Sequence, residues 1–332
     1  MGVERIADAR DIRLLDEWQR DFPLESRPFI RIGAALGCSE AEVLRRLATH
    51  VADGRVSRVG ATCAPNTISA STLAAVAAPD SRIDVIAAII GVQPGVNHVY
   101  QRENRWNLWF VATGPDRAHV NASLAAIARA TGLRVLNAPL VRPFNVDLGF
   151  RLDGSGTPLP PKRAVDATAI EPGDREILQA LTAGMPIVAR PYRQIGALLA
   201  RSEREVIARV AALTHAGIIS RLGVIVRHRA LGWSSNAMVV WDIPEERIES
   251  AGPALAAFPG VTLCYERRPE PVLWPYRLYC MIHAKSRSRA MDVLAGAAEL
   301  PDLRDAPRRV LFSSRCFKQT GAMIAPAPET VT

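Results

Sequence analysis

The chain has 332 residues, of which 48% are hydrophobic and 22% are charged, a composition that excludes a disordered or fibrous protein. No apolar run approaches the roughly 20 residues that cross a bilayer, and the charged N-terminal segment lacks the apolar stretch of a signal peptide, so we expect a cytoplasmic protein with no membrane partner. The net charge of +8 comes almost entirely from arginine, which indicates an anionic ligand, either nucleic acid or a polycarboxylate, unless it only reflects the codons of a GC-rich genome.

A repeat dominates the chain. Residues 11–60 align without a gap on residues 174–223, a shift of 174 − 11 = 163 positions, with 19 identities in the 50 aligned positions. The matches include Arg-Pro steps at 27–28 and 190–191 and Ser-Glu steps at 39–40 and 202–203. Chance would give only a few identities, so the chain is an internal duplication.

Each repeated segment has the pattern of a helix-turn-helix followed by a wing. Ser39 and Ser202 each precede a glutamate by three positions, which is the pattern of a capping box at the start of the third helix. Gly54 and Gly217 end that helix, and the residues that follow predict a wing hairpin in each copy. We therefore expect winged helix-turn-helix domains over residues 1–62 and 174–225.

After each wing, the sequence predicts the order strand, helix, strand, strand, helix, strand. These elements cover residues 71–79, 83–90, 96–103, 106–113, 117–131 and 133–141 in the first copy, and 234–244, 246–258, 261–268, 276–284, 286–300 and 308–314 in the second. Two helices on one face of a four-stranded antiparallel sheet form a ferredoxin-like domain. The predicted fold class is therefore α+β, with ligand domains at 63–151 and 226–323, a Gly- and Pro-rich linker at 152–173 and a tail at 324–332.

Short strings in the ligand domains resemble a known family. The first copy contains G-V-N-H-V-Y-Q-R-E at 95–103 and W-N-L-W-F at 106–110. The second contains R-H-R-A-L-G at 227–232, N-A-M-V-V-W at 236–241, C-Y-E-R-R-P at 264–269 and W-P-Y-R-L-Y-C-M-I-H at 274–283. A winged helix followed by such a domain resembles the Lrp/AsnC transcription regulators. Within that group the strings are more similar to the siroheme decarboxylases of the heme d1 and alternative heme pathways, here with two related subunits fused.

This resemblance implies a reaction. Siroheme decarboxylases remove the acetate carboxyls at ring positions 12 and 18 of siroheme, which leaves methyl groups and gives 12,18-didecarboxysiroheme. The sequence has no motif for pyridoxal phosphate, thiamine or a metal, and its five cysteines form no C-x-x-C pair. We therefore expect no cofactor, because the only iron belongs to the tetrapyrrole substrate.

His98, Tyr100 and Arg102 lie two positions apart and share one face of a predicted strand. By residue type alone, a tyrosine and an arginine on an exposed sheet face are common. The resemblance makes His98 a candidate general acid, with Tyr100 and Arg102 beside it to hold a carboxylate. The second copy keeps Tyr265 and Arg267 but has leucine at 263, the histidine position, so the two copies are not equivalent.

His228, between two arginines, is the second candidate acid, and the residues leave open which histidine donates the proton and which one binds. Trp274 is favoured as a ring that flanks the macrocycle, because Pro275 beside it indicates a loop or strand start rather than a core position. The full set of expected substrate-binding residues is Tyr265, Arg267, Arg268, Trp274, Tyr276, Arg277, Trp109 and His283.

The rival hypothesis is a DNA-binding regulator of the Lrp/AsnC type that senses a small ligand. Reading base edges needs arginine, asparagine or glutamine on the outward face of the recognition helix. That face is acidic and rich in alanine: its residues are Glu40, Ala41, Arg45, Ala48 and Thr49 in the first copy and Glu203, Arg204, Ala208, Ala211 and Ala212 in the second. We therefore expect no sequence-specific DNA partner. Because Lrp-like domains bury their sheets by pairing, we expect the two copies to form a pseudo-dimer within the chain, and a homodimer of whole chains is a further expectation.

Overall fold

The structure, a computed structural model, describes residues 8–146, 149, 151–152 and 164–325. Residues 1–7 of the expected first winged helix, 153–163 of the expected linker and 326–332 of the expected tail lie outside the described residues. Among the described residues, no helix combines the length and the apolar character that crossing a membrane requires.

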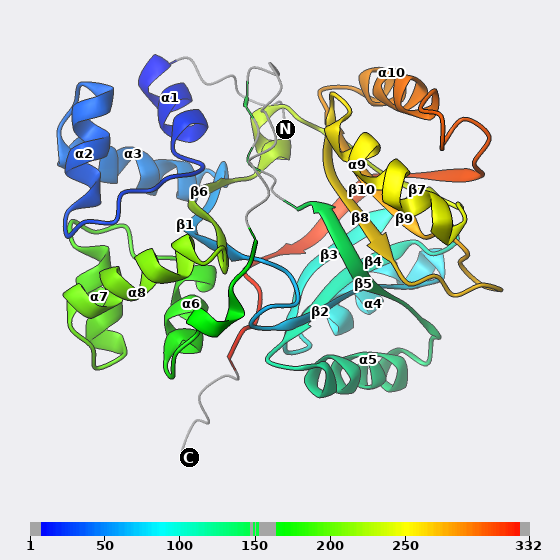
Figure 1. The fold of residues 1–332 in the computed structure, drawn as a ribbon, viewed down its shortest axis with the longest axis horizontal. Coiled ribbons are helices and arrows are strands. Elements are labelled where there is room, and N and C mark those ends of the chain that lie inside the picture. Colours follow the sequence, from blue (N-terminus) through cyan, green and yellow to red (C-terminus); the bar gives the residue numbers. More distant parts are fainter. Residues whose placement is uncertain (1–7, 147–148, 150, 153–163, 326–332) are drawn as a thin grey trace.

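Each repeated segment folds into three helices and one strand. In the first copy these are α1 (Ala9–Glu17), α2 (Pro28–Leu36), α3 (Glu40–Ala52) and β1 (Val56–Cys63), and in the second they are α6 (Asp174–Ala183), α7 (Pro191–Leu198), α8 (Glu203–His215) and β6 (Ile219–Val226). Ser39 and Ser202 cap α3 and α8 as predicted, with a complete capping box only at Ser202. The two winged-helix units lie together on the left of Figure 1.

The predicted wing hairpins are wrong. β1 of the first copy pairs with β6 of the second copy in an antiparallel two-stranded sheet, with Gly60 opposite Gly223. A Cβ atom on Gly60 would lie 2.2 Å from the carbonyl oxygen of Leu181 in α6, and one on Gly223 would lie 2.4 Å from the backbone of Gln19, just after α1. Each wing strand therefore packs against the other copy, and the two units share one hydrophobic core.

The predicted order of elements in the two ligand domains is confirmed. The first domain contains β2 (Ala70–Val76), α4 (Ile83–Gly91), β3 (Val96–Arg102), β4 (Leu108–Gly114), α5 (Arg117–Thr131) and β5 (Val135–Asn145). The second contains β7 (Ser235–Trp241), α9 (Ile248–Ala257), β8 (Val261–Arg267), β9 (Leu278–Ala284), α10 (Arg287–Ala298) and β10 (Arg308–Gln319). Short 3-10 helices are η1 (Asp80–Arg82), η2 (Ala167–Ala169), η3 (His228–Leu231) and η4 (Glu245–Arg247).

The two ligand-domain sheets join into one closed barrel with the strand order β10-β3-β4-β2-β5-β8-β9-β7. Two long strands make the junctions. In β5, residues 135–139 pair with β2 and residues 140–145 pair with β8 of the other copy. In β10, residues 308–312 pair with β7 and residues 313–319 pair with β3. The two copies are thus paired within the chain, and in Figure 1 their helices cover the outside of the barrel.

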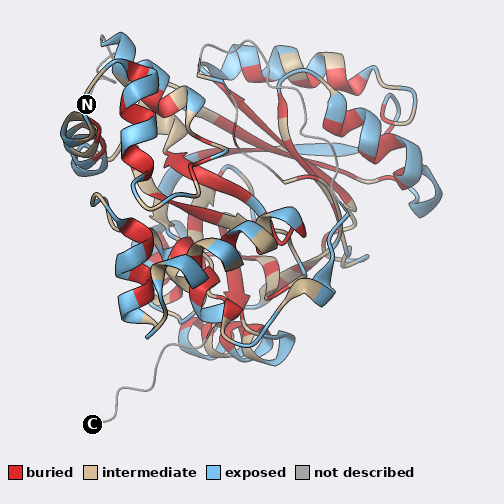
Figure 2. Cartoon of the chain, turned by 60° about the vertical axis from the view of Figure 1, so that its left-hand side comes forward, coloured by how far each residue is buried: buried red, intermediate tan, exposed pale blue. Residues whose placement is uncertain are grey.

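The barrel strands bury side chains on both faces, and Figure 2 shows buried residues in red along these strands. The outward faces form a separate core with the helices of each domain. The inward faces form a third core that includes Trp109, Trp274 and Tyr279. The prediction that Trp274 lies outside the core is wrong: the residue is 4% exposed, and its indole nitrogen donates a hydrogen bond of 2.8 Å to the hydroxyl of Tyr279.

Candidate active site

A cavity of about 610 Å³ occupies the part of the barrel interior that the apolar core leaves open. Side chains from both copies line it, together with the segment that leads from β6 into η3. The lining residues are Leu73, Asn97, His98, Tyr100, Arg102, Trp109, Phe110, Val111, Arg227, His228, Arg229, Ala230, Asn236, Met238, Leu263, Tyr265, Arg267, Met281, His283, Cys316, Phe317, Lys318 and Gln319. A volume of this size is typical of a small-molecule binding site.

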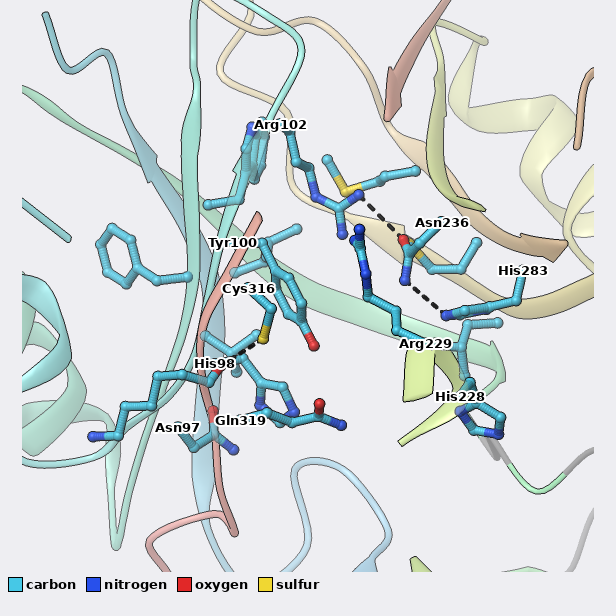
Figure 3. A pocket seen from close by; sticks show the side chains of 18 of the residues that line it. Asn97, His98, Tyr100, Arg102, His228, Arg229, Asn236, His283, Cys316 and Gln319 are labelled. Carbon is cyan, nitrogen blue, oxygen red and sulfur yellow. Dashed lines mark hydrogen bonds between the residues drawn. The ribbon is translucent and has the colours of Figure 1, made fainter. Parts of the chain in front are cut away.

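Strand alternation brings His98, Tyr100 and Arg102 of β3 to the same cavity wall. The rings of His98 and Tyr100 are stacked with 6.1 Å between their centroids, and the Arg102 guanidinium lies 5.6 Å from the Tyr100 ring. In the second copy, Arg267 lies 4.9 Å from the ring of Tyr265. The two Tyr-Arg pairs face one cavity (Figure 3 labels the first of them).

The cavity is strongly cationic. Its lining contains Arg102, Arg227, Arg229, Arg267 and Lys318 and no aspartate or glutamate. In the described part of the chain, none of these four arginines pairs with a carboxylate, although Arg102 is only 6% exposed. Burial lowers the pKa of Arg102 to about 10, which still leaves the guanidinium charged at neutral pH. A buried cation without a counter-ion is costly, so this lining is suited to an anionic ligand.

The cavity histidines are neutral at neutral pH. Burial and the nearby Arg58 lower the pKa of His98 to about 4. Burial, with contributions from His283 and Arg221, also lowers the pKa of His228 well below its usual value. An anion bound beside these rings would favour the protonated forms and raise both pKa values. The site can therefore gain a proton when an anion binds.

His228 reaches the cavity because of the strand that precedes it. β6 ends at Val226 on the wing sheet, and the chain then turns through η3, where His228 lies with its ring 5.8 Å from the ring of His283. Arg229 in the same turn donates a hydrogen bond of 3.1 Å to the carbonyl of Ser313 in β10. The segment that follows the winged helix of the second copy thus supplies one wall of the cavity, and Figure 3 shows His228 and Arg229 on the side opposite His98 and Tyr100.

Of the twelve residues expected at the site, eight line the cavity: His98, Tyr100, Arg102, Trp109, His228, Tyr265, Arg267 and His283. The other four lie elsewhere. Arg268 is exposed, and Trp274 lies in the core behind Trp109, with 5.2 Å between the two ring centroids. Arg277 forms ion pairs with Glu245 and Glu266, and the hydroxyl of Tyr276 accepts a hydrogen bond from Arg309. These four lie in the segment that joins β8 to β9, and none of them lines the cavity.

Sequence reasoning missed several lining residues. Lys318 and Gln319 lie beyond the predicted end of the last strand at residue 314, because β10 continues along β3 of the first copy. Asn236 begins the string N-A-M-V-V-W, and strand alternation with Met238 could have placed it on the inner face. Thr262 contacts His283 behind the cavity wall, and no sequence signal marks it.

Comparison with known proteins gives consistent matches along the chain. The model of the AsnC-like ligand binding domain matches residues 68–142 and 230–318, and the model of the siroheme decarboxylase NirDL-like HTH domain matches residues 11–55 and 174–219. The siroheme decarboxylase NirDL subunit of Paracoccus denitrificans is 56% identical over 318 residues, which are 96% of this chain and 98% of the relative.

Shorter relatives match one copy each. In Stutzerimonas stutzeri, the siroheme decarboxylase NirD subunit is 48% identical over 145 residues and the NirL subunit is 34% identical over 151 residues, with 95% and 89% of their own lengths covered. These matches cover 44% and 46% of this chain. Among solved structures, the siroheme decarboxylase NirDL has the same fold, with a TM-score of 0.64 at 24% identity and coverage of 94% of this chain and 93% of that one. A second structure of that enzyme holds an iron-uroporphyrin III analogue.

Proposed function

Because this chain belongs to the siroheme decarboxylase family, we propose that its cavity binds siroheme and removes the acetate carboxyls at ring positions 12 and 18, giving 12,18-didecarboxysiroheme. The chain is an enzyme of this class, since its relatives match at high identity over their full length. The main observation in favour of siroheme as the substrate is that the cavity lining is cationic and contains no carboxylate.

The charges of siroheme complement this lining. The macrocycle carries eight carboxylates around a flat ring, and guanidinium groups bind carboxylates through two parallel hydrogen bonds. We assign Arg102 and Arg267 to two of these carboxylates, with the hydroxyls of Tyr100 and Tyr265 completing the hydrogen bonds. Trp109 supplies an apolar wall for the ring. Arg268, Trp274, Tyr276 and Arg277 have no part in this proposal, because they lie outside the cavity.

Each decarboxylation needs one proton. When the bond between the acetate CH2 and its carboxylate breaks, carbon dioxide leaves and the electron pair passes to the methylene carbon and the conjugated ring. One proton per carboxyl then completes the methyl group. His98 or His228 supplies this proton in the proposal, because both rings line the cavity and an anionic substrate would raise their pKa values. Which of the two is the acid stays open.

The DNA-binding alternative finds no support on the recognition helices. Arg27 pairs with Glu40 in the first turn of α3, and Arg190 pairs with Glu203 in the first turn of α8. These arginines are already neutralised, and the glutamates repel phosphate. We therefore assign the winged helices the structural role of holding the η3 segment at the cavity.

The experiment that tests the proposed function is anaerobic incubation of the full chain with siroheme, followed by mass spectrometry of the tetrapyrrole. The expected result is loss of two carbon dioxide units from siroheme. Iron-coproporphyrin III, which has methyl groups where siroheme precursors have acetates, is the control: it should bind and release no carbon dioxide. Siroheme recovered at its original mass would overturn the proposal.

A further inference from the structure

We infer that Thr262, His283 and Asn236 act as positioning residues, forming a hydrogen-bonded chain that aims the Arg102 guanidinium at the substrate. The inference rests on the proposed function in one respect, that Arg102 holds a carboxylate of siroheme. These three residues and Arg102 are named here the positioning chain. Thr262 lies on β8, His283 on β9, Asn236 on β7 and Arg102 on β3, so the chain runs from the sheet of the second copy to the first copy.

The contacts of the positioning chain are continuous. The hydroxyl of Thr262 lies 2.7 Å from Nδ1 of His283, and Nε2 of His283 lies 2.8 Å from Nδ2 of Asn236. The amide oxygen of Asn236 accepts a hydrogen bond of 3.4 Å from Arg102. His283, Asn236 and Arg102 are each less than 10% exposed, with relative exposures of 9%, 8% and 6%. Figure 3 shows the last two links as dashed lines.

The direction of every hydrogen bond follows from the single proton of Thr262. Its hydroxyl donates that proton to the carbonyl of Met281 at 3.0 Å, so it must accept from Nδ1–H of His283. Nε2 of a neutral His283 then carries no proton and accepts from the Asn236 amide. This leaves only the amide oxygen of Asn236 to face the guanidinium, where an amide turned the other way would present a donor to a donor.

Nearby cations keep this arrangement stable. Burial, with Arg102 and Arg229 close by, lowers the pKa of His283 to about 3, so the ring stays neutral. The ring of His228 also faces His283 at 5.8 Å, and it is neutral for the same physical reason. Both ring nitrogens of His283 are therefore engaged within the protein, which makes His283 a poor candidate for direct contact with substrate.

The first copy lacks this chain. Asn236 and His283 are register partners between β7 and β9, and the corresponding partners between β2 and β4 are Ser71 and Thr113. The hydroxyl of Thr113 donates to the carbonyl of Gly95 instead. Arg267, the counterpart of Arg102, donates to the backbone carbonyl of Ala138 at 2.9 Å. Arg102 donates to the equivalent backbone carbonyl, that of Leu311, at 3.2 Å, so the side-chain acceptor Asn236 is an addition that only Arg102 has.

Nitrogen-15 NMR on the tetrapyrrole-free chain, labelled at histidine, tests the positioning chain without reference to activity. The His283 signals are assigned by comparison with His283→Gln. The expected result at neutral pH is a neutral imidazole with its proton on Nδ1. A proton on Nε2 alone, or a doubly protonated ring, would overturn the inference, and this measurement on the unmodified chain decides the matter even if variants fold poorly.

Siroheme affinity gives the second readout. Thr262→Val removes the hydroxyl at similar volume and should weaken siroheme binding roughly tenfold, the scale of one hydrogen bond. The substitution should also remove the preference of His283 for the tautomer with its proton on Nδ1. Thr262→Ser should restore both properties. Ser71→Ala, at the position matching Asn236, is the control and should leave affinity unchanged. Unchanged affinity in Thr262→Val would refute the positioning role, whereas intact tautomer and affinity with no release of carbon dioxide would refute only the proposed function.

Discussion

At matching positions of β3 and β8, one copy has His98 and the other has Leu263, while the tyrosine and arginine that follow are the same. The shared tyrosine and arginine can bind anions in both copies, but of these two strands only β3 has a histidine that could donate a proton. This difference was readable from sequence alone, because it needs only the alignment of the repeat and strand alternation. The lowered pKa of His98 was not readable, since it depends on burial and on the charge of Arg58 in β1, and the pairing of β3 with β10 joins segments far apart in the sequence.

Alanine substitution at the two candidate acids tests the chemistry. His98→Ala and His228→Ala should each lower kcat by about 10²–10⁴-fold, the usual loss for a general acid, and change siroheme affinity much less. His215→Ala, at an exposed position in α8, is the matched control. Single-turnover kinetics would measure the rate of decarboxylation, and parallel binding titrations would measure siroheme affinity. A variant with wild-type turnover would remove that histidine from the mechanism.

Lysine substitution at the paired arginines tests carboxylate binding. Arg102→Lys and Arg267→Lys keep the charge but lose the planar pair of donors, so siroheme affinity or turnover should fall clearly in each. The losses should be unequal, because each arginine donates to a backbone carbonyl but only Arg102 also has a side-chain acceptor, Asn236. The melting temperature should move little. Arg268→Lys, the exposed neighbour of Arg267, should change neither property. Equal and negligible effects at 102 and 267 would place the carboxylate sites elsewhere.

At the scale of elements, local pattern determined most of what could be predicted. The capped helices and the twelve elements of the ligand domains follow from periodicity and turn residues within short windows. The pairing of β1 with β6 could not be predicted, because a wing strand reads the same whether its partner is local or in the other copy. For the same reason the predicted last strand ended at residue 314, although β10 continues to Gln319 once it has β3 to pair with. Trp274 was misplaced because Pro275 suggested a loop, yet its indole fills the barrel core.

The packing of each wing strand against the other copy gives a prediction at this scale. Gly60→Ala and Gly223→Ala should each destabilise the chain by about 1–3 kcal/mol, because the added methyl group would press on the backbone of the other copy. Thermal unfolding followed by circular dichroism provides the measurement. Gly91→Ala, where a Cβ would meet no atom within 4 Å, is the control and should not lower the melting temperature. Equal stability of all three variants would contradict the packing of wing strands across the copies.

At the scale of the whole molecule, fusion of two copies allows one cavity to have unlike walls. In a dimer of identical chains every substitution appears twice, so a histidine opposite a leucine at symmetry-related positions is impossible. Here the two copies differ at His98/Leu263 on the cavity wall, and Asn236 lines the cavity where the first copy has Ser71, which does not. His98 of the first copy can therefore face the same cavity as Asn236 and His283 of the second copy.

Separation of the copies tests how far each depends on the other. Two polypeptides that divide the chain within residues 153–163 should fail to fold when expressed singly, because the winged helices share one core and β5 and β10 each pair with both copies. Co-expression should restore a 1:1 complex that binds siroheme, as relatives with separate NirD and NirL subunits suggest. Gel filtration and tetrapyrrole absorption measure the outcome. A single half that is folded and monomeric would show that the copies are independent.

Closure of the barrel also governs how copies of the whole chain can meet. Each of its eight strands has two neighbouring strands, but each half of β5 and of β10 pairs on one side only. Open edges are where soluble β proteins aggregate or exchange strands, and among the described strands they are confined to the halves of β5 and β10 and to the short β1–β6 sheet. Self-association through strands would therefore have to use these short edges. During folding, we expect concentrated chains to be most exposed to mispairing at the β5 and β10 junctions, because these join residues far apart in the sequence.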